Sequence, residues 1–76
     1  MNEKRRKRLR EAIGHLESAS ALVEQCATEE QTAYDALPEP IQWTERGEKM
    51  QSAVESMEEA VSLIDEATRL VDEASE

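Results

Sequence analysis

Residues 37–50 read LPEPIQWTERGEKM, and this stretch decides how the chain folds. It holds both prolines of the sequence, Pro38 and Pro40. Neither can lie inside a continuous helix, because proline lacks an N–H and crowds the preceding turn. A helix that reaches this stretch must therefore end near Ala36. Thr44 suits the start of a second helix, with its side-chain oxygen accepting a backbone N–H one turn further along.

Apolar residues recur every seven positions on both sides of this break, which predicts a helix in each half. In the second half, one repeated position holds Met50, Met57, Ile64 and Val71, and an alanine row follows three residues later at Ala53, Ala60, Ala67 and Ala74. In the first half, the matching rows are Leu9, Leu16 and Val23, then Ala12, Ala19, Cys26 and Ala33. A third row holds Ile13, Ala27 and Tyr34 in the first half, and Val54 and Val61 in the second. We expect helices at about 4–36 and 44–75, each about 45–50 Å long.

Two helices of equal length around a short break predict an all-α fold, an antiparallel two-helix hairpin. Residues 1–76 then form one domain, with a basic start at 1–10 and a proline-containing turn at 37–43. Folding at Pro40 predicts that small residues meet along an alanine-rich heptad seam, with Ala12 level with Ala67, Ala19 with Ala60 and Cys26 with Ala53. The alternative is a straight rod of two chains, which requires helix through both prolines.

A lone hairpin of this size has a core too small for much stability. Burying a large apolar side chain contributes about 1.5–3 kcal/mol, whereas ordering each residue costs about 1.5 kcal/mol. Leu22, Leu63 and Leu70 widen the apolar stripe beyond what one partner helix covers. We therefore expect self-association into a four-helix bundle or a larger oligomer.

Composition restricts the compartment and the class of protein. The single cysteine cannot form an internal disulfide, and the basic start does not resemble a signal peptide. No apolar run approaches the roughly 20 residues that cross a bilayer. We expect a cytoplasmic protein without a membrane span.

The net charge of −9 is unevenly distributed, because residues 1–10 are basic and the rest of the chain is acidic. The basic residues are Lys4, Arg5, Arg6, Lys7, Arg8 and Arg10. Dense positive charge favours phosphate backbones, so nucleic-acid binding is one hypothesis. The favoured alternative is pairing with acids near the end of the second helix, and no aromatic residue is interleaved to stack on bases. Acidic pairs such as Glu58 and Glu59 are typical of solvated helix, although an acidic stripe can also imitate a phosphate backbone.

Catalysis has little support in the sequence. His15 and Cys26 are the only residues of their types, and about three helical turns separate them. Glu11 and His15 are two metal ligands at most, which is too few for a dedicated site. We therefore expect no enzyme activity, no cofactor and no metal.

The turn supplies the one candidate ligand site. The second helix begins with free N–H groups and carries Arg46 and Lys49 in its first turns, which favours an anion. The predicted ligand-binding residues are Tyr34, Trp43, Thr44, Arg46, Gly47 and Lys49. The competing hypothesis is structural: Leu37, Ile41 and Trp43 plug the open end of the hairpin while Arg46 pairs with Glu30.

The stretch DALPEPIQWTERGEKMQSAVESMEEAV, residues 35–61, resembles a group of small, acidic helical-hairpin proteins encoded by phages and prophages. The matching positions are Asp35, Leu37, Pro38, Glu39, Gln42 and residues 44–50, whereas Pro40 and Trp43 depart from the pattern. The resemblance implies an accessory protein of a phage or mobile element that antagonises host defence in the cytoplasm of an infected or lysogenic bacterial cell. Its partner would be a host defence protein, or a cyclic or adenine nucleotide that it sequesters. The open alternatives are a nucleic-acid-associated protein and a purely structural bundle.

Overall fold

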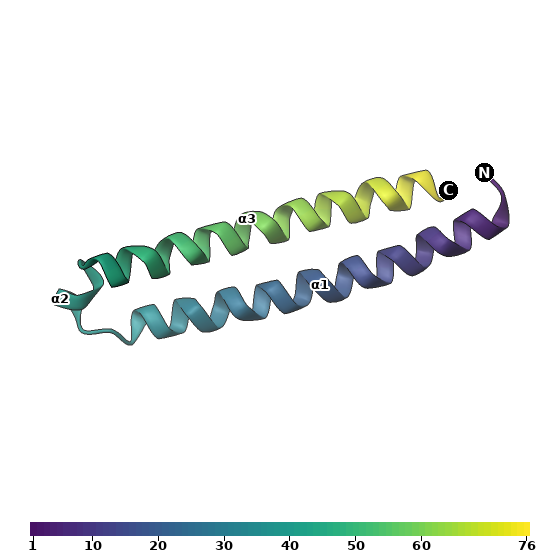
Figure 1. Cartoon of the computed structure of the whole chain (residues 1–76). Coiled ribbons are helices and arrows are strands. Elements are labelled where there is room, and N and C mark those ends of the chain that lie inside the picture. The colour runs from purple at the N-terminus through teal and green to yellow at the C-terminus, as the bar shows by residue number, and fades with distance from the viewer.

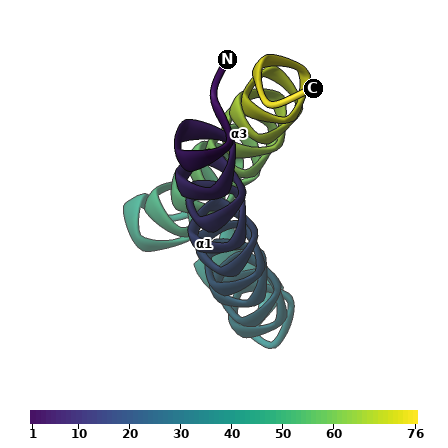
Figure 2. The same cartoon turned by 90° about the vertical axis from the view of Figure 1, so that its right-hand side faces the viewer.

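The computed structural model describes all 76 residues and contains three helices, α1 (Glu3–Asp35), α2 (Glu39–Gln42) and α3 (Glu45–Ala74). α1 and α3 pack against each other in antiparallel directions (Figure 1), and the molecule measures 58 × 14 × 12 Å. In the view of Figure 2 the two long helices cross at an angle, as packed helices generally do. The hairpin prediction is confirmed, and the bounds of both long helices lie within one residue of those expected. No helix has the length and apolar character needed to cross a membrane.

Local sequence explains where the helices begin and end. The side chain of Asn2 accepts a hydrogen bond of 2.8 Å from the N–H of Arg5, which caps α1. Pro38 and Pro40 stop α1 from continuing, and Pro40 occupies the first turn of α2, where its missing N–H would have no helical partner. The predicted turn at 37–43 therefore contains a short helix.

The seam between α1 and α3 follows a 3,4 spacing on both helices. On α1 the residues that are buried or partly buried at this spacing are Leu9, Ile13, Leu16, Ser20, Val23, Ala27, Glu30 and Tyr34. On α3 they are Gly47, Met50, Val54, Met57, Val61, Ile64, Thr68 and Val71. Ala27 and Val54 are the only buried apolar side chains, and neither is fully enclosed. Two helices alone thus enclose a narrow core.

The predicted alanine seam is wrong. Ala19, Cys26 and Ala33 are exposed on α1, and the α3 alanines Ala53 and Ala60 are only partly buried. The neighbouring rows, which hold most of the Leu, Ile, Val and Met side chains of both helices, occupy the seam instead. The physical reason is that larger side chains remove more apolar surface from water than alanine does.

The predicted register is also wrong. Folding at Pro40 would place Ser20 opposite Glu59, but the Ser20 hydroxyl donates a hydrogen bond of 2.8 Å to Asp65. The helices are therefore displaced by about one and a half turns. As a result, α3 begins beyond the end of α1 at the turn, and α1 begins beyond the end of α3 at the termini (Figure 1).

The packing of α2 explains this displacement. α2 contacts the start of α3, and Gly47 lies directly against the backbone of Gln42. A Cβ at Gly47 would lie 2.6 Å from the carbonyl carbon of Gln42 and 2.8 Å from its Cα. Only glycine permits this approach, so the first turn of α3 packs on α2 and projects past α1.

Candidate functional site

The turn is held together by the side chain of Gln42. Its amide nitrogen donates to the carbonyl oxygens of Tyr34, at 3.2 Å, and Leu37, at 3.3 Å. These carbonyls lie at and just beyond the end of α1, where helical partners are missing. The side chain of Gln42 therefore joins the end of α1 to α2, and its backbone packs closely against Gly47.

Three of the six predicted ligand-binding residues meet beside this turn. Tyr34, Trp43 and Gly47 line an open pocket together with Gln42, Glu48, Gln51, Ser52 and Glu55. Thr44, Arg46 and Lys49 are not among its lining residues. Each residue turns an α-helix by about 100°, so Arg46 points away from the side of α3 that carries Glu48. The cations predicted to bind an anion therefore lie outside the pocket.

The charge of the pocket disfavours an anionic ligand. Its only ionisable acids are Glu48 and Glu55, and no cation lines it. Lys49 pairs with Glu45 at 3.3 Å, within the same helix. A phosphate here would meet carboxylates without a compensating positive charge.

The predicted cap at Thr44 is wrong. Thr44 has the extended backbone of an N-cap residue, but its side chain makes no capping hydrogen bond. The hydroxyl instead donates to the carbonyl of Ile41, at 2.5 Å. The turn formed by α2 brings that carbonyl within reach, and the side chain bonds backwards as a result.

The alternative prediction, a structural plug at the turn, is only partly correct. Leu37 and Ile41 are partly buried, as a plug requires. Trp43 is not part of a plug, because 77% of its surface is exposed. The expected Arg46–Glu30 pair is absent, since every ion pair in the structure joins residues of one helix. Packing within a single hairpin therefore does not explain why a tryptophan lies at this position.

The basic start of α1 has no acidic partner on α3. Its one ion pair joins Arg6 to Glu3 at 3.5 Å, and the Nε of Arg6 has no hydrogen-bond partner. The predicted neutralisation by the acidic end of α3 is therefore absent within one chain. The displaced register explains this, because the first turns of α1 extend beyond α3 (Figure 1).

The cation near the end of α3 is already paired. Arg69 bonds Glu66 at 2.5 Å and Glu73 at 2.7 Å. The hydrogen bond to Glu66 and the charges of Glu66 and Glu73 raise the pKa of Arg69 above its ordinary value. Arg69 therefore stays charged and pairs with two acids of its own helix.

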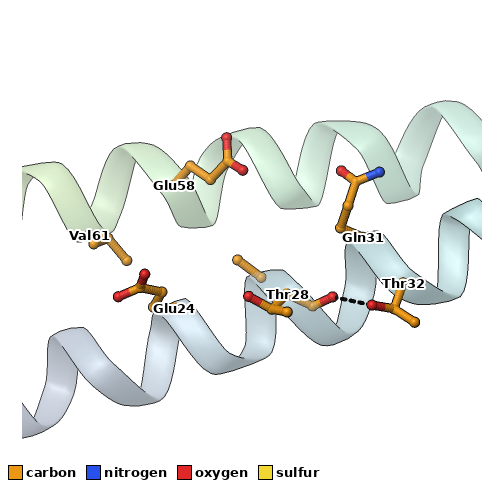
Figure 3. Close-up of a pocket in the computed structure, with 7 residues that line it drawn as sticks. Glu24, Thr28, Gln31, Thr32, Glu58 and Val61 are labelled. Carbon is orange, nitrogen blue, oxygen red and sulfur yellow. Dashed lines mark hydrogen bonds between the residues drawn. The ribbon is translucent and has the colours of Figure 1, made fainter.

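An acid-lined groove runs along one flank of the hairpin (Figure 3). Glu24, Thr28 and Gln31 of α1 border it together with Glu58 and Val61 of α3. A neighbouring hollow lies between Glu17 of α1 and Asp65 and Asp72 of α3. Acids of both helices therefore border the same flank of the hairpin. The sequence could have predicted this flank from the 3,4 spacing of the seam residues, because the acids follow them by one position on both helices.

The two residues considered for chemistry, His15 and Cys26, both lie on the surface of α1. Cys26 is a free, exposed thiol, and His15 is exposed on the same helix. No group of three His, Cys, Asp or Glu side chains is placed to hold a metal ion.

No protein-family model, curated protein or solved structure matches the chain. The resemblance of residues 35–61 to phage hairpin proteins therefore stays a prediction.

Proposed function

We propose that this chain is a non-catalytic helical protein that self-associates and acts by occupying the surface of another protein. The observation that carries the proposal is Trp43, which lies at the turn between α2 and α3 and is 77% exposed. Tryptophan is enriched among the residues that contribute most binding energy at protein interfaces. A large aromatic side chain held in water without a structural task is best explained by a partner that covers it.

The surroundings of Trp43 favour a protein partner over a nucleotide. Beside it, Glu48 and Glu55 offer carboxylates, and the side chains of Gln51 and Ser52 offer hydrogen bonds. Lysine, arginine and backbone N–H groups of a protein complement such a surface. The phosphates of a nucleotide would be repelled by it.

The biological setting rests on the resemblance to phage proteins. We propose that the chain is an accessory protein of a phage or mobile element and that its target is a component of host defence. Self-association belongs to the same proposal, because a hairpin whose only buried apolar side chains are Ala27 and Val54 needs a further partner for stability.

A capture experiment tests this function. Tagged wild-type protein is incubated with bacterial lysate in parallel with Trp43→Ala and with Gln25→Ala, a control on the exposed surface of α1. We expect a foreign protein to be retained by the wild type and the control, and lost with Trp43→Ala. Failure of the wild-type chain to retain any foreign protein would overturn the proposal.

Calorimetry with cyclic and adenine nucleotides tests the competing ligand. We expect no heat of binding. If the wild type binds a nucleotide and both Trp43→Ala and Arg46→Ala abolish the heat of binding, the function is nucleotide sequestration and not protein binding.

Nucleic-acid binding is the second candidate, and the displaced register is the observation that favours it. The basic residues between Lys4 and Arg10 make no ion pair with α3. They also lie at the positive end of the α1 dipole, which disfavours cations unless an anion is near. A polyanion would relieve this repulsion.

A gel-shift series with short DNA and RNA at low and moderate salt tests this candidate. The matched variant carries glutamine in place of Lys4, Lys7 and Arg8. A real complex should weaken steeply with salt, and the slope should fall by nearly one unit for each phosphate that the variant no longer binds. Absence of any shift with the wild type at low salt removes the candidate.

A further inference from the structure

We infer that the flank opposite the acid-lined grooves is the surface through which two copies of this chain associate. The inference rests on the proposed self-association and identifies its surface and its occupant. We call this surface the alanine flank. On α1 it consists of Ala12, Ala19, Leu22, Cys26 and Ala33, and on α3 of Ala53, Ala60, Leu63, Ala67 and Leu70.

The grooves show why both rows face the same way. Glu24 and Gln31 follow the seam residues of α1 by one helical position, and Glu58 does the same on α3; all three border one groove. Residues on the opposite side of each seam therefore share the opposite flank. Those residues are the alanine rows. The alanines predicted to meet across the hairpin instead lie side by side on its outside.

The alanine flank has the spacing of a second seam. On α3, Ala60, Leu63, Ala67 and Leu70 recur at intervals of three and four residues, as the internal seam does. Small residues alternate with leucines, an arrangement that lets two helical layers interdigitate. Within one chain this pattern has nothing to pack against, since Leu22, Leu63 and Leu70 are 63%, 64% and 50% exposed.

The charge of the alanine flank permits a second copy as the occupant. The chain carries 18 acidic residues, yet Glu29 is the only one at the two heptad positions that form this flank. Two chains of net charge −9 can approach through such a surface with little direct repulsion. The same two positions hold Arg5 and Arg8 at one end and Arg46 and Lys49 at the other. Between these two ends, Glu29 is the only Asp, Glu, Lys or Arg at the two positions.

The area of the molecule agrees with a dimer. The hairpin exposes 5674 Å², whereas a compact monomer of its mass, 8.6 kDa, exposes about 4,700 Å². The excess is about 1,000 Å², close to the roughly 800 Å² that each partner buries in a stable interface of standard size. Docking two alanine flanks forms a four-helix bundle and removes this excess.

Substitution at Leu63 tests the surface. The dissociation constant of the dimer is measured by analytical ultracentrifugation for the wild type, for Leu63→Glu and for the control Ser62→Glu. Ser62 is the exposed neighbour of Leu63 and lies outside the alanine flank. We expect Leu63→Glu to weaken association about a hundredfold, because the dimer carries the substitution twice and each tenfold step is about 1.4 kcal/mol. Ser62→Glu should associate like the wild type.

Cys26 gives a second measurement that needs no substitution. Its thiol is exposed in the single hairpin and lies in the middle of the alanine flank. We expect its reaction with a maleimide to slow at least tenfold as the protein concentration is raised through the dissociation constant. Circular dichroism at each concentration verifies that helix content is unchanged.

The outcomes separate this inference from the proposed function. A wild-type dimer that Leu63→Glu weakens, with Cys26 protected, supports the alanine flank. If the dimer tolerates Leu63→Glu as well as Ser62→Glu and leaves Cys26 reactive, the alanine flank is the wrong surface while self-association stands. A wild type that stays monomeric up to about 1 mM, where the binding free energy is only about −4 kcal/mol, overturns both self-association and this inference.

Discussion

Replacing Gly47 with alanine is expected to destabilise the hairpin, whereas the same replacement at Gly14 is expected to stabilise it. Both glycines lie inside long helices, where alanine is favoured over glycine by about 0.5–1 kcal/mol. They differ in what a new Cβ would meet. At Gly14 nothing lies within 4 Å, whereas at Gly47 the Cβ would lie 2.6 Å from the carbonyl carbon of Gln42 and 2.8 Å from its Cα.

The geometry sets the size of the effect. Carbon atoms in good contact lie about 3.5–4.0 Å apart, so α2 must move away from α3 by about 1 Å to accept the methyl group. Overpacking of this kind costs about 1–3 kcal/mol. The two hydrogen bonds from the Gln42 side chain to the end of α1 are strained by the same movement, at a cost of up to about 1 kcal/mol each. After the gain in helix propensity, Gly47→Ala should lower the free energy of unfolding by about 1–3 kcal/mol.

Urea unfolding followed by circular dichroism measures both variants against the wild type. The protein concentration must be the same in all samples, because association adds to the apparent stability. Gly14→Ala should raise the free energy of unfolding by about 0.5–1 kcal/mol, which places the two variants about 1.5–4 kcal/mol apart. If Gly47→Ala unfolds at the same urea concentration as Gly14→Ala, the close packing of Gln42 on α3 does not exist in solution. The account of the displaced register would then fail.

Three further substitutions test the seam and the turn. The hydrogen bond between Ser20 and Asp65 should give a coupling energy of about 0.5–1.5 kcal/mol in a double-mutant cycle with alanine at both positions, and zero coupling would contradict the register. Val54 is the most buried apolar side chain, with 2% of its surface exposed, so Val54→Ala should cost about 1.5–3 kcal/mol in the same urea assay; a loss below about 0.5 kcal/mol would show that the core lies elsewhere. Because Thr44 does not cap α3, Thr44→Asp should supply the missing acceptor and raise the melting temperature by a few degrees, corresponding to about 0.5–1 kcal/mol. An unchanged or lower melting temperature would indicate that Thr44 already caps the helix in solution.

Local sequence predicted only some of the residues that meet at the candidate site. Sequence placed Tyr34, Trp43 and Gly47 together, because the turn brings the end of one helix to the start of the next. It assigned Arg46 and Lys49 to the same site from their proximity in the chain. Proximity along a helix does not fix direction, and about 200° of rotation separates Arg46 from Glu48. The contribution of Gln42 was not predicted, since a glutamine in a turn has no distinctive pattern.

The sequence by itself determined the two long helices, their ends and the reversal of the chain. These features depend on local chemistry: a heptad of apolar residues favours an amphipathic helix, and two prolines interrupt it. Such effects act within one or two turns, so they can be inferred residue by residue.

Only the tertiary structure decided the register and the choice of seam. Each helix carries two overlapping 3,4 patterns, one of larger residues and one rich in alanine, and both satisfy the helical period equally well. A seven-residue repeat also looks the same after sliding by one repeat, so periodicity alone does not align the helices. The alignment is decided where the backbone of Gln42 meets Gly47 and where Ser20 reaches Asp65. These contacts join residues of separate helices, and their geometry exists only once α2 has folded against α3.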